Sequence, residues 1–335
     1  MNNNIRKFLY RNKNIISILS KLLRFKNENK YFDEVINREK LDIFNYIEIA
    51  KELPYYPFDN IADNNLYGIS YCLKKYFGIP LSIDLNAYIE HGVYFGNYIS
   101  KDTNISYPQN IITVSPQREV HLKLLSKKKI KKIGPYILYA KPILTNIQFV
   151  KLKEELGKVL LVFPSHSVKG LKSLFDIDSL IQVINENKIH YDSVLVCLYY
   201  LDTYDNEITK KYLENNFRIV CAGHKYDYNF LSRLRSIIEL ADHTISNNVG
   251  THIGYCGALN KTHQIFPQKI NYRGWNSNEK NIRSENEKLS YQIEIEEVES
   301  FFSLPIDIQP IHKKKYILEK YFGCNCSVAN LHDII

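Results

Sequence analysis

The stretch KVLLVFPSHS, residues 158–167, is a run of apolar residues that ends in a polar loop. Because polar residues do not alternate with the apolar ones, the run predicts a strand that is buried on both faces. The segment DIDSLIQVINEN, residues 176–187, follows with helical spacing of its apolar residues and an aspartate at its start. A buried strand followed by such a helix is the repeating unit of a parallel α/β sheet.

The same alternation continues towards residue 267. Further strands are predicted at DSVLVCLYYLD (192–202), FRIVCAGHKYD (217–227), HTISN (243–247) and THQIFP (262–267). Helices are predicted between them at NEITKKYLENN (206–216), NFLSRLRSIIELAD (229–242) and VGTHIGYCGALNK (249–261). This order predicts a Rossmann-like parallel sheet that is covered by helices on both faces.

The first half of the chain shows a weaker form of this pattern. Strands are predicted at LSIDLNAYIEHG (81–92), NIITVSP (110–116) and GPYILYAKP (134–142), and helices at 33–51, 64–77 and 148–156. A chain of 335 residues exceeds what one hydrophobic core usually serves. We therefore expect an α/β protein with two Rossmann-like domains facing a central cleft. Their expected ranges are 31–150 and 151–285, with an N-terminal helical segment at 1–30 and a C-terminal helical tail at 286–335.

Composition restricts the class of protein. The hydrophobic content of 45% and the charged content of 24% are ordinary for a soluble globular protein. The sequence contains no run of about 18 apolar residues and therefore predicts no transmembrane helix. The start MNNNIRKFLYRNKN lacks the features of a signal peptide. We expect a cytoplasmic protein. Its six cysteines are scattered without zinc spacing, which favours reduced thiols and no metal site.

The formal net charge of +8 is concentrated in two segments, residues 6–30 and KLLSKKKIKK (123–132). No nucleic-acid-binding motif accompanies them, so nucleic acid is not an expected partner. Residues 5–26 combine helical spacing of apolar residues with many basic ones, which predicts a basic amphipathic helix. Such a helix either lies on an anionic membrane surface, here the inner membrane, or packs against its own domain. Both alternatives stay open from the sequence.

Polar residues gather where the strands of the second half end. In parallel α/β sheets, ligands bind at the carboxyl ends of the strands. The residues predicted there to bind a phosphorylated donor are Ser165, His166, Ser167, Lys169, Gly223, His224, Lys225, Asp227, Ser246, Asn247, Asn248, Gly250, Thr251 and His252. Asp227 has the alternative role of capping the following helix.

The segment SNNVGTHIGYCGALNK, residues 246–261, places Gly250, Thr251 and His252 at the start of a predicted helix. A helix N-terminus offers free backbone N–H groups and the positive end of a dipole, which together attract phosphate. The alternative is an ordinary helix cap made by Ser or Asn. The pattern is neither a P-loop nor a G-x-G-x-x-G dinucleotide fingerprint.

Two polar groups end the first strands of the first half. Glu90 and His91 follow an apolar strand, and a carboxylate with an imidazole in such a loop suits general base catalysis. The alternative for His91 is a hydrogen-bonded position in a turn. Gln117 and Arg118 follow the next strand and are predicted to bind an acceptor.

The segment AGHKYDYNFLSRLRSIIELADHTISNNVGTHIGYCGALNK, residues 222–261, resembles the C-terminal half of bacterial capsule and O-antigen polysaccharide biosynthesis proteins, which are similar to GT-B glycosyltransferases. The EHG loop (90–92) resembles the loop from which such enzymes draw the base that activates the acceptor. PSHS (164–167) and SNNVGTH (246–252) are loosely similar to the CMP-binding motifs of bacterial sialyltransferases, although no proline follows His166.

This resemblance implies a metal-independent glycosyltransferase of bacterial surface polysaccharide biosynthesis, for capsule, O-antigen or lipooligosaccharide. The nucleotide-sugar donor, for which a CMP-sugar is one candidate, is a substrate, and no cofactor is expected. The partner would be a glycan or lipid-linked acceptor, which a peripheral position on the inner membrane would bring within reach. Two alternatives stay open: a nucleotide-sugar epimerase on the same two-domain frame, and a non-catalytic protein that binds sugars or anionic polymers.

Overall fold

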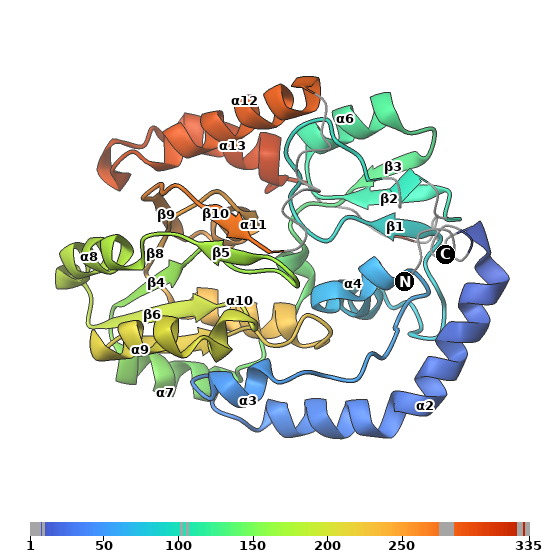
Figure 1. The fold of residues 1–335 in the computed structure, drawn as a ribbon, viewed down its shortest axis with the longest axis horizontal. Coiled ribbons are helices and arrows are strands. Elements are labelled where there is room, and N and C mark those ends of the chain that lie inside the picture. The colour runs from blue at the N-terminus through green and yellow to red at the C-terminus, as the bar shows by residue number, and fades with distance from the viewer. Residues whose placement is uncertain are drawn as a thin grey trace.

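Two parallel sheets form the framework of the computed structural model (Figure 1). It describes residues 8, 11–100, 103–104, 107–274, 285–326 and 331. The stretch at 158–167 forms β4 (Val159–Phe163), whose five residues are all buried. The protein is therefore a mixed α/β protein with parallel sheets flanked by helices, consistent with a Rossmann-like fold.

The larger sheet has the order β7-β6-β4-β8-β9, and all its strands are parallel. The other strands are β6 (Ser193–Leu198), β7 (Arg218–Cys221), β8 (His243–Ser246) and β9 (Thr262–Ile265). The helices of this half are α7 (Asn146–Leu156), α8 (Ile177–Asn187), α9 (Asn206–Glu214), α10 (Phe230–Leu240) and α11 (Thr251–Ala258). The strands and helices predicted between residues 158 and 267 are thus confirmed. A short antiparallel pair, β5 (Lys172–Leu174) and β10 (Asn271–Arg273), was not predicted.

The smaller sheet has the order β1-β2-β3, again parallel. Its strands are β1 (Ala87–Ile89), β2 (Asn110–Thr113) and β3 (Lys129–Lys132), with α6 (Pro116–Leu125) between the last two. The strand predicted at 134–142 is wrong, because Tyr136–Tyr139 forms the 3₁₀ helix η2. The third strand lies instead in the lysine-rich segment before it. Lysines suit an edge strand, where they discourage pairing with other chains.

The N-terminal helices also differ from their predicted bounds. A single helix, α2 (Lys13–Glu39), replaces the predicted break near residue 30, and the short α3 (Tyr46–Ala50) follows. No glycine or proline interrupts the sequence of α2. The predicted helix residues before position 11 lie outside the described part, apart from Phe8.

The helix predicted at 64–77 is divided into η1 (Ala62–Gly68) and α4 (Ile69–Tyr76). At the division, Tyr67 and Gly68 have φ values of +59° and +71°. A Cβ atom on Gly68 would lie 2.3 Å from the carbonyl oxygen of Tyr228, so the larger half of the chain contacts η1 at this turn.

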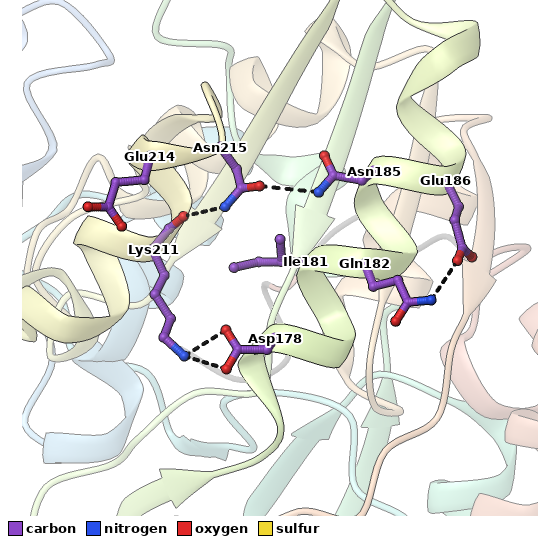
Figure 2. A pocket seen from close by; sticks show the side chains of 8 residues that line it. All are labelled: Asp178, Ile181, Gln182, Asn185, Glu186, Lys211, Glu214 and Asn215. Carbon is purple, nitrogen blue, oxygen red and sulfur yellow. Dashed lines mark hydrogen bonds and ion pairs between the residues drawn. The ribbon is translucent and has the colours of Figure 1, made fainter.

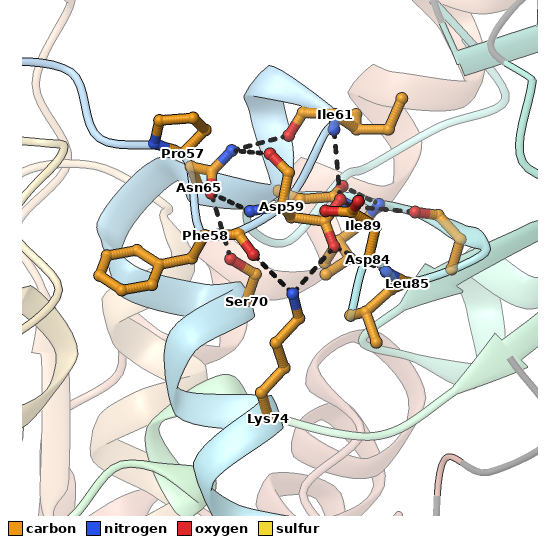
Figure 3. Close-up of polar contacts among 12 residues, drawn as sticks. Pro57, Phe58, Asp59, Ile61, Asn65, Ser70, Lys74, Asp84, Leu85 and Ile89 are labelled. Carbon is orange, nitrogen blue, oxygen red and sulfur yellow. Dashed lines mark hydrogen bonds and ion pairs between the residues drawn. The ribbon is translucent and has the colours of Figure 1, made fainter. Parts of the chain in front are cut away.

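A buried ion pair holds η1 beside the smaller sheet (Figure 3). Asp59 and Lys74 are both 0% exposed, and Lys74 Nζ lies 3.5 Å from Asp59 Oδ2. The same ammonium group donates to the carbonyl of Phe58 at 2.5 Å, and Asp59 Oδ2 accepts from the Leu85 amide at 2.8 Å. The pair therefore joins α4, the segment before η1 and the segment before β1.

The predicted helical tail is confirmed as α12 (Glu285–Phe302) and α13 (Ile311–Phe322). Both lie along the top of Figure 1, where α13 extends from α11 towards α6. Cβ atoms on Gly254 and Gly257 would lie 2.6 Å from side-chain atoms of Phe322 and Leu318, so α13 packs directly on α11. The tail thus contacts both halves of the chain.

The two sheets share apolar packing. The largest apolar cluster includes Ile112 of β2 as well as Leu161 of β4 and Leu195 of β6. Such a shared core holds the two halves together. The domain boundaries at residues 150 and 285, and a GT-B arrangement of the two halves around a cleft, remain predictions.

Candidate active site

The order of the larger sheet indicates where a ligand would bind. The chain passes from β4 outward through β6 to β7, and then returns to β8 on the other side of β4. In such sheets, the crevice forms at the carboxyl ends of the two strands where the direction changes. Ser165 follows β4 and Asn247 follows β8, and the Ser165 amide donates to Asn247 Oδ1 at 2.7 Å. The predicted segments 164–167 and 246–252 therefore meet at this point.

The first turn of α11 lies at the same place. Gly250 is its N-cap residue, in an extended conformation, and no side chain caps the helix. Within the described part of the chain, the amides of Thr251 and His252 have no hydrogen-bond acceptor. Two buried side-chain atoms are also unpartnered there, Ser165 Oγ and His252 Nε2. Unsatisfied donors around a helix N-terminus are suited to an anion.

His252 is held in a neutral state. Its ring stacks on Phe163 at 5.0 Å between centroids. Burial, with the nearby charge of His166 as a smaller cause, lowers the pKa of His252 to about 3. A Cβ atom on Gly250 would lie 2.8 Å from two atoms of the imidazole, so the glycine leaves room for this ring. A neutral imidazole can offer its N–H without bringing a charge into the site.

The first half of the chain meets α11 through the loop after β1. The Val93 amide donates to Thr251 Oγ1 at 3.0 Å, and a Cβ atom on Gly92 would lie 2.9 Å from that oxygen. Glycine at position 92 thus permits the close approach of the two segments. We call this region the seam: it is the contact between the loop after β1, at Gly92 and Val93, and the start of α11, at Thr251.

Four rings connect the halves across the seam. The His166 and Tyr199 rings lie 4.6 Å apart, and the Tyr199 hydroxyl is 3.3 Å from that of Tyr67. The Tyr67 ring in turn lies 6.1 Å from the ring of His91. The structure therefore brings His91 from the first half and His166 from the second to opposite ends of one aromatic row. Tyr67 and Tyr199 were not predicted, because neither a tyrosine at the end of η1 nor one after β6 belongs to a sequence motif.

Asp63 is a third residue near the seam that the sequence analysis did not predict. Its Oδ2 accepts a hydrogen bond from the Tyr88 hydroxyl at 2.6 Å. Burial lowers the pKa of His91, and the charge of Asp63 opposes that shift. Burial and the charge of Lys169 likewise lower the pKa of Lys225, and Asp63 again opposes the shift. Asp63 therefore lies close enough to act electrostatically on a predicted base of one half and a predicted phosphate ligand of the other.

Asp63 is placed there by its neighbour Asn64. The Asn64 side chain donates to the carbonyl of Ala87 at 2.9 Å and accepts from the Ile89 amide at 2.7 Å. These bonds fix η1 against the backbone of β1, next to the loop that contains His91. The Tyr94 hydroxyl also contacts His91, at 3.2 Å from Nδ1. No sequence motif distinguishes Asp63, because its position depends on pairing between residues some 25 positions apart.

Glu90 and Arg118 are placed differently from their predicted roles. Their side chains form a buried ion pair at 2.6 Å, in which Glu90 also accepts from Thr113 Oγ1 at 2.7 Å. Arg118 Nη1 donates to the Gly96 carbonyl at 3.0 Å. Because each side chain satisfies the other, the structure gives no geometric support to Glu90 as a base or to Arg118 as an acceptor ligand. The pair supports the loop at 90–96 instead.

Gln117 is also used within the protein. Its Nε2 donates to Glu294 Oε1 of α12 at 2.7 Å. The same carboxylate contacts His121 Nε2 at 2.6 Å and accepts from the Gly96 amide at 2.6 Å. This arrangement joins α6, the loop after β1 and the tail, and leaves the predicted acceptor role of Gln117 without geometric support.

Several predicted donor residues of the second half have structural partners. Asp227 pairs with buried Arg233 at 3.2 Å and accepts from the Asn229 amide at 2.8 Å, whereas no side chain caps α10, so the capping alternative is not confirmed. Gly223, at φ +112°, packs against that pair. Ser167 Oγ accepts from the Ser173 amide at 3.1 Å. These contacts hold the loops after β4 and β7, and they argue against direct ligand contacts by these side chains.

Of the remaining predicted residues, some bind the backbone of their own loop or are buried, and two lysines are at least partly exposed. Ser246 Oγ donates to the Asn248 carbonyl at 2.9 Å, and Asn248 Oδ1 accepts from the Val249 amide at 2.8 Å. His224 is buried, and its pKa falls to about 3 chiefly through burial, with smaller effects of Arg38 and Lys225. Lys169 is exposed and Lys225 half-buried.

Two pockets of the structure lie away from the seam. One is formed between α8 and α9 and contains the ion pair of Asp178 and Lys211 (Figure 2). A second lies nearby, between the start of α8 and the start of α9. Neither is lined by a predicted site residue.

Comparison with known proteins gives no match, either to a protein-family model or to a curated protein. Among the described residues, no group of three or more His, Cys, Asp or Glu side chains could hold a metal ion. Within that part of the chain, no helix is both long and apolar enough to span a bilayer. The function must therefore be argued from the seam itself.

Because several histidines are buried, we expect the stability of the fold to decrease at acidic pH. Burial lowers the pKa of His243 to about 4, and the pKa values of His224 and His252 fall to about 3. Since an unfolded histidine titrates near pH 6.5, the unfolded chain binds more protons between these values. Stability should thus be complete above about pH 6.5 and decrease as the pH falls from there. Urea midpoints measured from neutral pH to about pH 4 test this decrease.

His243→Asn, which can keep the bond that His243 Nδ1 makes with Thr262 Oγ1, should weaken the dependence on pH. The same substitution at exposed His190 should leave the dependence unchanged. A midpoint that stays constant over this pH range would contradict the prediction.

Proposed function

We propose that this chain is a metal-independent glycosyltransferase of GT-B type, which transfers a sugar from a nucleotide-activated donor to a glycan or lipid-linked acceptor in bacterial surface polysaccharide biosynthesis. The proposal rests on the arrangement of groups at the seam. An uncapped helix N-terminus with unsatisfied donors lies at the switch point of a parallel sheet, and a histidine loop from the other half lies against it.

On the donor side, the first turn of α11 would bind the phosphate. The amides of Thr251 and His252, with Ser165 Oγ and His252 Nε2, are available as hydrogen-bond donors. Lys169 lies near enough to Lys225 for its charge to lower the pKa of Lys225, after the larger effect of burial, and both would add positive potential beside the anion. As the sugar–phosphate bond breaks, negative charge grows on the leaving phosphate, and donors placed in advance stabilise that charge most.

On the acceptor side, His91 would be the general base. The acceptor hydroxyl oxygen attacks the anomeric carbon, its proton passes to the imidazole, and the bond from that carbon to the phosphate oxygen breaks. Burial keeps His91 unprotonated, ready to accept that proton. The negative charge of Asp63 would then stabilise the imidazolium that forms. Asp63 thus takes the carboxylate role that the sequence analysis gave to Glu90.

Ser165→Ala provides a direct test of the donor side. The hydroxyl of Ser165 has no partner, so its removal should leave the unfolding temperature of the free protein unchanged. Thermal shifts with CMP, UDP, GDP and their sugars identify the donor class, since a ligand of the folded state raises its apparent stability. A hydrogen bond to a charged group contributes about 1.5–3 kcal/mol. The variant should therefore bind the stabilising nucleotide about tenfold or more weakly.

Ser303→Ala is the matched control, because Ser303 Oγ is also buried and unpartnered but lies beyond the end of α12. Its nucleotide affinity should equal that of the wild type. If no nucleotide or nucleotide sugar stabilises the protein, the donor site is wrong. If a nucleotide sugar is converted to an isomer without release of nucleotide, the epimerase alternative is correct.

A further inference from the structure

The first half of α2 exposes a row of large apolar side chains. Ile18 is 59% exposed, Leu22 60% and Phe25 87%. Their spacing of four and three residues puts them on one face of the helix. Single exposed apolar residues are common on protein surfaces, but an aligned row of this size indicates an interaction site.

The second half of the same helix behaves in the opposite way. Tyr31 and Val35 are 0% exposed and pack with Phe58. Between the two halves, Arg24 is held at 3.0 Å from Asp84. The helix is therefore fixed on the protein, and it runs along the outer edge of the molecule in Figure 1. Its apolar row is exposed to solvent.

The charges of α2 divide at the same point. From residue 11 to residue 26 the chain has five basic side chains and no acidic one, namely Arg11, Lys13, Lys21, Arg24 and Lys26. The acidic residues of the helix all lie in its second half, namely Glu28, Asp33, Glu34 and Glu39. The half that exposes apolar side chains thus has only basic charged residues, of which Arg24 is paired with Asp84.

We propose that residues 11–26 bind the surface of a bilayer containing anionic lipids, with Ile18, Leu22 and Phe25 inserted between the headgroups. Basic side chains beside an apolar row are the features by which helices bind such interfaces, through apolar burial and attraction to lipid phosphates. This resolves the alternatives of membrane and self-packing within one helix: its second half packs on the protein and its first half on lipid. The inference does not require sugar transfer and would stand if the proposed function failed.

Sedimentation with vesicles tests the proposal. The wild-type chain should sediment with vesicles of phosphatidylcholine and phosphatidylglycerol, and much less with phosphatidylcholine alone. Leu22→Ser with Phe25→Ser should reduce binding at least tenfold, since both apolar contacts are lost. Lys21→Glu with Lys26→Glu should reduce it by a similar factor, and added salt should weaken the binding of the wild type.

Matched controls come from the same molecule. Ile36→Ser changes an apolar side chain of α2 that is 45% exposed but lies in the acidic half. Lys210→Glu with Lys315→Glu makes the same change of net charge on α9 and α13, where both lysines are highly exposed. Both controls should bind vesicles like the wild type, and all variants should unfold at the wild-type temperature.

Failure of the wild type to bind the anionic vesicles would overturn the proposal. So would unchanged binding by both test variants. A dimer of the wild-type chain that is lost on Leu22→Ser with Phe25→Ser, measured by light scattering, would show that a second copy covers the row instead, and this too would overturn it.

Discussion

Replacing His91 by alanine is expected to lower kcat for sugar transfer by about 10²–10⁴-fold, the usual contribution of a positioned general base. The nucleotide-induced thermal shift should remain, because the donor groups lie on the other half of the chain, at Ser165 and in the first turn of α11. Added imidazole should restore part of the activity, which a purely structural histidine would not allow. Nucleotide release in the presence of an acceptor is the measurement.

The pH profile adds a second readout for the same residue. Burial lowers the pKa of His91, so the unprotonated base should persist below pH 6.5, and activity should fall only at lower pH. Because the charge of Asp63 raises that pKa, Asp63→Asn should shift this acid limb further down and reduce the maximal rate. His190→Ala, at an exposed position, is the control. If His91→Ala retains full activity, another residue is the base.

Replacing Lys74 by methionine is expected to lower the free energy of unfolding by about 3–5 kcal/mol, the cost of leaving a buried charge without its partner. Asp59 has no exposed surface and would keep its three hydrogen bonds, from Asn64 and the amides of Ile61 and Leu85, but lose its counter-ion. Burial already raises the pKa of Asp59, and the charge of Lys74 opposes that shift. The variant should therefore regain part of its stability at lower pH, where Asp59 can be protonated.

Lys75→Met is the matched control, because Lys75 is the next residue of α4 and is exposed. It should change the stability by less than about 0.5 kcal/mol. Urea unfolding of both variants gives the comparison. Equal midpoints for Lys74→Met and Lys75→Met would mean that the buried pair does not stabilise the fold.

The second half of the chain was predictable because its signals are local. Apolar runs such as 159–163 need no partner to be recognised as buried strands, and Asp176 begins its helix as a cap whose side chain accepts from the amides of Asp178 and Ser179. Strand order could not be predicted in the same way, since it depends on which strands pair. Yet the rule that ligands bind at the carboxyl ends of the strands placed Ser165 and Asn247 in one predicted site, and the structure joins them by a hydrogen bond.

The first half was harder, for two physical reasons. Its strands are three or four residues long, too short for periodicity to separate β3 from η2. Its polar residues are also paired across long stretches of sequence, as Glu90 is with Arg118. A carboxylate in a buried ion pair and a catalytic carboxylate are the same residue type in the sequence. Only the side chain that each contacts in the structure distinguishes them. For the same reason, the sequence does not distinguish Asp63, whose position depends on the hydrogen bonds between Asn64 and the backbone of β1.

Gly254 and Gly257 have a mechanical consequence. They let Phe322 and Leu318 lie against a helix of only two turns, and Thr251 begins that helix. Because these contacts begin one turn after Thr251, we expect a displacement of the first turn of α11 to move the surface on which α13 packs. By thermodynamic linkage the transmission works equally in both directions. We therefore expect α13 to respond to a ligand bound at the seam, and a displacement of α13 to weaken that binding.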